Sequence, residues 1–125
     1  LHYPLRRQRQ MCIRDRYIYI MESHKRACEK CITDCTKCKL ECLVHGQLEC
    51  VKFCEICILA CNLCLTVCSL HTSPQMHAAA MKACHAACHD CYEECKKHSA
   101  KHCKACATTC LRCVNLFKSK KTRKH

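Results

Sequence analysis

The stretch CVKFCEICILACNLCLTVC, residues 50–68, carries six cysteines at intervals of 4, 3, 4, 3 and 4. Residues three and four apart lie above one another on an α-helix, so these thiols form a stripe along one face. In coiled coils the same rhythm marks the buried seam, which branched aliphatic side chains normally fill. The stretch therefore predicts a helix whose core-facing side is made of thiols.

Three further blocks repeat this spacing, so the sequence predicts four helices. The chain has 20 cysteines in 125 residues and one glycine, and no segment shows the period of two that a strand requires. Short connections between the blocks favour antiparallel neighbours. We predict an all-α fold, an antiparallel up-down-up-down four-helix bundle. Its cysteine-lined core comprises Cys28, Cys31, Cys35, Cys38, Cys42, Cys50, Cys54, Cys57, Cys61, Cys64, Cys68, Cys84, Cys88, Cys91, Cys95, Cys103, Cys106, Cys110 and Cys113.

Capping residues mark the ends of the predicted helices. His45-Gly46 offers a glycine C-cap after the first helix. Ser73-Pro74 places an N-cap serine before a proline at the first position of the third. Ser99 is the corresponding candidate for the fourth. Helices of about 20–24 residues would be about 30–36 Å long.

The formal charge of +12 is concentrated at the two ends of the chain. Residues 1–20 contribute +4 and residues 118–125 contribute +5. We interpret residues 1–20 as a non-native or disordered extension, 21–117 as the bundle and 118–125 as a basic disordered tail. Cys12 is therefore set apart from the other nineteen cysteines.

Composition also restricts partners and location. The chain lacks the aromatic-and-basic pattern of specific nucleic-acid recognition, so no such partner is expected. No stretch approaches 18 consecutive apolar residues, which argues against a membrane-spanning helix. From Met21 the chain is charged at once and shows no leader, which predicts a cytoplasmic protein with reduced thiols.

Packing alone does not explain so many thiols, because each occupies a core position where Leu, Ile or Val would normally lie. Truncating a core leucine to alanine costs about 2–5 kcal/mol. Disulfides within a helix are disfavoured, since Cβ atoms one turn apart lie about 5–6 Å from each other against about 3.5–4.5 Å in a disulfide. Metal–thiolate bonds of about 2.3 Å span the wider gap. We therefore predict that the core binds metal.

All-thiolate ligation selects Cu(I), Zn(II) or iron–sulfur clusters. The continuous rows lack the segregated groups of four that Zn(II) takes, and ferredoxin spacings such as CxxCxxC do not occur. One Cu(I) per thiolate leaves the core nearly neutral, whereas one Zn(II) per four thiolates leaves a charge of about −2 at each site. We predict multiple Cu(I) ions per chain, with an iron–sulfur electron-transfer protein or general Zn/Cd sequestration as alternatives. No activated nucleophile with an orienting base stands out, so an enzyme is not expected.

One end of the predicted bundle collects imidazole and thioether side chains. His77 and Met81 continue the spacing of the third cysteine block. Such side chains bind Cu(I) without losing a thiol proton, so this end is the predicted entrance. The candidate entry ligands are His24, His71, Met76, His77 and Met81.

The other histidines are predicted to lie mainly at the surface. His45, His98 and His102 fall at the opposite end and are less well placed on the stripes. His85 and His89 lie beside the third stripe.

The helix around residues 48–70 is apolar on all sides. A helix of this kind is buried all round. Its outer face therefore predicts a subunit interface in a homo-oligomer.

Over residues 22–117 the chain resembles the bacterial copper storage proteins, a likeness carried by all four cysteine blocks. The resemblance implies a homotetramer that stores many Cu(I) ions in each protomer. An entrance with both histidine and methionine is similar to that of the cytosolic branch. We predict a protein that binds and stores Cu(I), for supply or detoxification, with copper-donor or copper-acceptor proteins as candidate partners.

Overall fold

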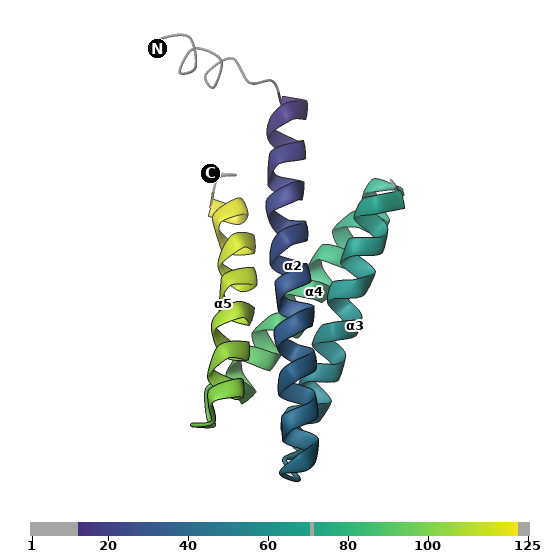
Figure 1. Ribbon diagram of the computed structural model, residues 1–125. Coiled ribbons are helices and arrows are strands. Elements are labelled where there is room, and N and C mark those ends of the chain that lie inside the picture. The colour runs from purple at the N-terminus through teal and green to yellow at the C-terminus, as the bar shows by residue number, and fades with distance from the viewer. Residues whose placement is uncertain (1–12, 71, 123–125) are drawn as a thin grey trace.

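The computed structural model describes residues 13–70 and 72–122, and all four of its elements are helices. These are α2 (Ile13–Val44), α3 (Leu48–Leu70), α4 (Pro74–Cys95) and α5 (Lys101–Thr122). Each helix packs against the next, and α5 packs against α2, so that the four close a ring (Figure 1). The predicted all-α four-helix bundle is confirmed.

Two helices are longer than their cysteine blocks require. α2 has 32 residues and begins at Ile13, within the segment expected to be an extension. α5 reaches Thr122, within the segment expected to be a disordered tail. The helices α3 and α4, with 23 and 22 residues, have the predicted length. Cys12 and His71 lie outside the described residues.

The turn between α2 and α3 confirms the predicted glycine C-cap. Gly46 has φ +74°, in the left-handed region that favours glycine. The amide of Gln47 donates to the carbonyl of Cys42 at 2.9 Å, and that of Gly46 donates to Leu43 at 3.3 Å. These bonds satisfy carbonyls that the end of a helix would leave unpaired. The turn is therefore tight enough to make α2 and α3 antiparallel neighbours.

One of the two predicted N-caps is confirmed and the other is wrong. Ser73 Oγ accepts a hydrogen bond from the amide of Met76 at 3.2 Å and caps α4. At the start of α5 the amide of Lys104 donates to the carbonyl of Ala100 at 3.0 Å. Ala100 therefore occupies the N-cap position, and Ser99 precedes it.

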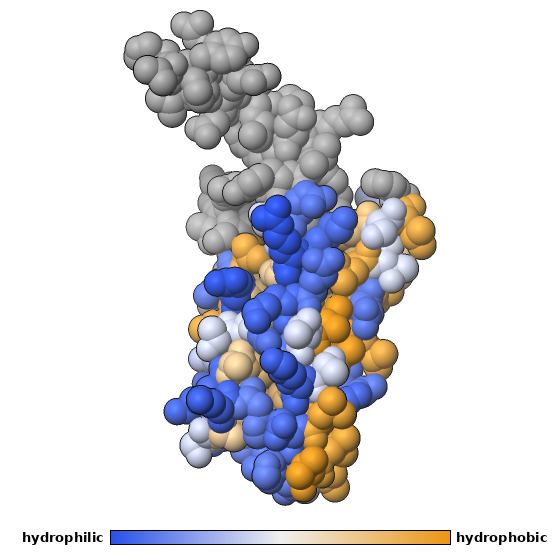
Figure 2. Space-filling view, viewed as in Figure 1, coloured by the Kyte–Doolittle hydropathy of each residue, from blue (hydrophilic) through white to orange (hydrophobic). Residues whose placement is uncertain are grey.

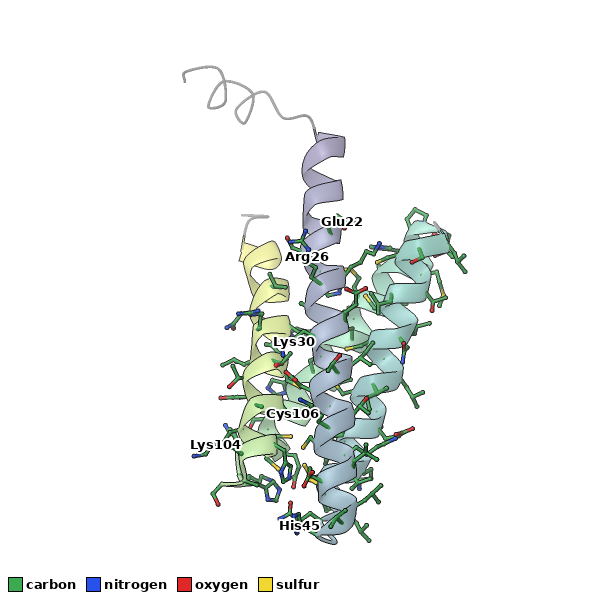
Figure 3. The ribbon with its side chains drawn as sticks, in the orientation of Figure 1. Glu22, Arg26, Lys30, His45, Lys104 and Cys106 are labelled. Atoms are coloured by element: carbon green, nitrogen blue, oxygen red, sulfur yellow. The ribbon has the colours of Figure 1, made fainter. Side chains whose placement is uncertain are left out.

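The interior of the ring is lined with sulfur. All the predicted core cysteines are fully buried except Cys64 and Cys68, which expose 1% and 6% of their surface. Figure 3 shows Glu22, Arg26 and Lys30 along the outside of α2, while the sulfur atoms lie between the helices. Ala27, Ala87 and other small or aliphatic side chains complete the core.

By length and composition alone, α3 could cross a membrane, with a mean hydropathy of 2.1 over its most apolar window. A search for consecutive apolar residues does not detect this helix, because polar residues interrupt its cysteines and aliphatic residues. The helix packs against both α2 and α4, and its cysteines are buried in the shared core. A core helix of a bundle satisfies the same composition test.

A buried polar pair fastens the closing contact between α2 and α5. Asp34 on α2 is 9% exposed and accepts a hydrogen bond from the hydroxyl of Thr109 on α5. Lys30 Nζ lies 3.4 Å from the same carboxylate. Because a buried carboxylate is costly without partners, this contact favours one register of α5 against α2.

We expect Thr109→Val to destabilise the metal-free, reduced protein by about 1–3 kcal/mol, because the Asp34 carboxylate loses a buried hydrogen-bond donor. Urea unfolding followed by circular dichroism measures the change. Thr108→Val is the matched control, since the exposed Thr108 hydroxyl bonds only to the Lys104 carbonyl of its own helix. Equal stability of the two variants would contradict a specific role for the buried pair.

Candidate metal centre

Sulfur atoms from all four helices approach one another along the bundle axis. Within α2, Cys31 and Cys35 have Sγ atoms 3.8 Å apart. Between helices, Cys35 Sγ lies 3.4 Å from that of Cys106 on α5, and Cys31 Sγ lies 3.5 Å from that of Cys57 on α3. We call this arrangement the sulfur ladder. Every cysteine in the described part of the chain is a free thiol.

Neighbouring thiols form groups of four that share members. Cys31 and Cys57 belong both to a group with Cys61 and Cys88 and to a group that includes Cys110. In each group the ligand atoms lie within 4.8 Å of one another. Other groups combine Cys35, Cys91, Cys106 and Cys110, and Cys38, Cys50, Cys54 and Cys95. A thiolate shared in this way can bridge two ions, and the Sγ contacts of Cys61 with Cys84 at 3.7 Å and of Cys91 with Cys95 at 3.9 Å connect these groups to the outer ones.

The spacing suits a metal with three or four sulfur ligands. With metal–sulfur bonds of about 2.3 Å, the sulfur–sulfur edge is about 3.8 Å in a tetrahedron and about 4.0 Å in a trigonal plane. Linear coordination needs about 4.6 Å. Contacts of 3.7–4.0 Å, such as those of Cys57 with Cys88 and Cys110, match the first two geometries. The core is therefore compatible with thiolate-bound metal.

Close contacts among the thiols shift their pKa values in opposite directions. Hydrogen bonds from Cys61 and Cys64 lower the pKa of Cys28 to about 7, against burial and Cys84, which raise it. The contact with Cys28 in turn raises the pKa of Cys61 above its ordinary value. Hydrogen bonds from Cys106 and Cys31 raise that of Cys110. Thiols whose pKa is lowered, such as Cys28, therefore ionise more readily than those whose pKa is raised, such as Cys61 and Cys110.

One end of the ladder carries a buried histidine, and we call this end the mouth. His24 is 3% exposed, and its Nε2 lies 3.0 Å from Cys64 Sγ and 3.6 Å from Cys28 Sγ. With Cys84 these groups form a set of one nitrogen and three sulfurs. Burial lowers the pKa of His24, but hydrogen bonds with Cys28 and Cys84 outweigh it and raise the pKa to about 9.

The other predicted entry ligands lie differently. His77 Nε2 is 3.5 Å from Cys68 Sγ, and Met81 is buried in the core at 8% exposure. Met76 is 41% exposed on the first turn of α4 and does not join the core. His71 falls outside the described residues. The structure therefore brings His24, His77 and Met81 to the mouth beside the last thiols of the ladder.

The expectation that the remaining histidines lie mainly at the surface holds for His89 and His45, whereas His102 is half-buried. The His89 side chain is 51% exposed and pairs with Asp90 and Glu93. In His102 the Nε2 atom is buried, and the ring stacks on that of His45. A sequence signal was available, because His102 stands four residues before Cys106. That spacing keeps it near the buried stripe of α5.

A family model described as copper storage protein matches residues 19–120. The chain belongs to the copper storage protein family. Comparisons with curated proteins and with solved structures gave no match. The match spans the cysteine blocks of all four helices, so the sulfur ladder lies within the matched part of the chain.

We expect His24→Ala to remove part of the thiolate absorbance at 240 nm that develops between about pH 7 and pH 9 in the metal-free protein. In this window the Cys28 thiolate and the His24 imidazolium coexist, with pKa values of about 7 and about 9. The imidazolium is favoured in the folded state up to about pH 9, and the thiolate is favoured down to about pH 7. Without the ring, ionisation of Cys28 moves to higher pH.

An anaerobic pH titration of the reduced protein measures this absorbance. His89→Ala is the control, because that ring pairs only with surface carboxylates. Superimposable curves for wild type and His24→Ala would contradict the pairing.

Proposed function

We propose that this chain stores multiple Cu(I) ions in the sulfur ladder, for supply to other proteins or for protection from free copper. The single observation that supports this most strongly is that successive thiol groups share members such as Cys31 and Cys110. A monovalent ion bound by bridging thiolates can fill such a row at about one ion per thiolate. The filled core is then nearly neutral, which avoids burying unpaired charge.

Zn(II) suits this core less well. A divalent ion in a group of four thiolates leaves about −2 in the interior. Adjacent groups share members such as Cys35, so they cannot each supply four unshared thiolates to a Zn(II) ion. Soft thiolate ligands, low coordination numbers and bridging all favour Cu(I).

Ions would enter at the mouth. Cys64 and Cys68, the only core cysteines with any exposure among those described, lie at this end. His77 contacts Cys68, and His24 contacts Cys64, so each terminal thiol has an imidazole beside it. A neutral imidazole can pass a copper ion to a thiolate, and His24, whose pKa is raised to about 9, first releases its ring proton.

The outer face of α3 would join copies of the chain into a homo-oligomer, a tetramer by analogy with the family. Leu59, Ile56 and Leu63 on this helix are 60%, 48% and 39% exposed. Figure 2 shows the apolar surface over α3, beside the charged surface of α2. Exposed apolar patches of this kind mark association sites. In this proposal the protein is a cytoplasmic binding protein, without catalytic activity and without membrane or nucleic-acid partners.

We expect the reduced protein to take up many Cu(I) ions, approaching about one per core cysteine, and far fewer Zn(II) ions. Anaerobic titration against a competing chromophoric chelator measures both capacities. Uptake that stops at one or two Cu(I) ions per chain would contradict storage. Visible charge-transfer bands in the protein as purified would instead favour an iron–sulfur protein.

We expect Leu59→Glu, combined with Ile56→Lys, to convert the oligomer into monomers while the Cu(I) capacity per chain changes little. The reason is that charges on α3 would disrupt a buried apolar interface but do not touch the ladder. Light scattering after size-exclusion chromatography gives the mass. Thr108→Glu, an exposed site on α5, is the control and should leave the mass unchanged.

A further inference from the structure

The end of the bundle opposite the mouth carries a histidine cluster that ion entry at the mouth does not explain. This loop end comprises residues 42–50, which join α2 to α3, and residues 95–103, which join α4 to α5. His45 appears at this end in Figure 3, at the tip of α2. His98 lies in the second connection, and His102 lies on the first turn of α5.

His102 presents a buried nitrogen without a hydrogen-bond partner. Its Nε2 is the one buried side-chain nitrogen or oxygen in the described residues that lacks a bond. Leaving such a group unsatisfied is destabilising. Unsatisfied buried groups in native proteins commonly mark a place that a water or an ion fills. A water or an ion that accepts the lone pair of this nitrogen would remove the cost.

His45 lies beside His102 and is exposed to solvent. The rings of His45 and His102 are nearly parallel, with an interplanar angle of 9° and centroids 6.2 Å apart. The His45 side chain is 59% exposed, and its nearest carboxylate oxygen, on Glu41, is 4.0 Å away. One imidazole therefore faces water, and the ring stacked on it carries a buried nitrogen.

The last thiols of the ladder lie next to this pair along both helices. His45 follows Cys42 by one helical turn, and His102 directly precedes Cys103. The Sγ atoms of Cys42 and Cys103 are 3.9 Å apart, and both cysteines are fully buried. Cys42 Sγ donates to Gln47 Oε1 at 3.6 Å. The two histidines are thus close in sequence to a contacting pair of thiols.

The neighbouring His98 does not share this role. Its Nε2 lies 3.0 Å from Glu94 Oε2, and this hydrogen bond lowers the pKa of the glutamate carboxyl. The ring is therefore engaged with a carboxylate. His102 and His45 are the two imidazoles that the loop end offers to a metal ion.

We propose that His102 and His45 form a second metal port, through which a soft monovalent cation exchanges between solvent and the thiols Cys42 and Cys103. The proposal rests on the proposed storage function. Imidazole nitrogen is a neutral ligand for copper, and an adjacent thiolate provides the balancing charge. The sulfur ladder would then be open at both ends, rather than at the mouth alone.

Distance makes a second port useful. Helices of 22 or 23 residues span roughly 33–35 Å at about 1.5 Å per residue. With the mouth as the only entrance, ions held by Cys42 and Cys103 could exchange only through the whole filled ladder. A port at the loop end exchanges them directly.

The test compares His102→Leu, His102→Met and wild type. Leucine removes the donor and keeps an apolar side chain, whereas methionine supplies a soft thioether. We expect chelator-driven release of Cu(I) from loaded His102→Leu to slow severalfold with the total capacity unchanged within about one ion, and His102→Met to recover most of the rate. His45→Ala should slow release less, and His89→Ala should have no effect.

Circular dichroism establishes that each variant keeps its helices. Equal release rates for His102→Leu and wild type would overturn the proposal, as would equal rates for the leucine and methionine variants. Failure of the storage function gives a different result, because wild type itself would then hold only one or two ions. A second measurement covers that case. On saturation with Cu(I), the ¹⁵N resonance of His102 Nε2 should move to a metal-bound position, and an unmoved resonance would also overturn the proposal.

Discussion

Contacts between sulfur atoms across the bundle axis take the place of the aliphatic packing that normally holds a helix bundle together. Cysteine is smaller than leucine, so a core of thiols buries less apolar surface per position. Distances of 3.4–4.0 Å between Sγ atoms of different helices show that the backbones close around these small side chains. Any ion bound between thiolates of different helices adds cohesion where the packing alone is weakest. Metal content and stability of this bundle are therefore linked.

The same constraint accounts for the unusual surface. With cysteines filling the axis, aliphatic side chains are displaced outward along α3. Val51, Phe53 and Ile58 are half-buried against the core, while Leu59 remains 60% exposed. Burial of this outer face against another copy would recover hydrophobic stabilisation that the core does not supply. Association of copies would then offset the smaller hydrophobic stabilisation of a core made of thiols.

Much of the fold follows from the sequence because the cysteine spacing identifies both the helices and their buried faces. The roles of Gly46 and Ser73 are also predicted correctly, because a left-handed φ and an N-cap depend on nearby residues alone. Ser99 fails because capping depends on where the helix begins, and the first α5 bond places Ala100 there. The stacking of His102 on His45 is not predicted, because the two residues lie far apart in sequence. Tertiary contacts of this kind leave only a weak trace in the local spacing.

The imidazoles at the two ends of the ladder follow from the charge balance of a bridged row. Inside the row, each thiolate can serve two cations, and each cation receives charge from two sides. A terminal cation lacks the next thiolate, and an additional cysteine there would bring an uncompensated negative charge into the protein. An imidazole completes the coordination without adding negative charge, and His24, with a pKa of about 9, first releases its ring proton. His24 and His77 hold this position at the mouth, where they contact Cys64 and Cys68. In the proposed second port, His102 would hold the corresponding position at the loop end, where its Nε2 is buried and without a bond.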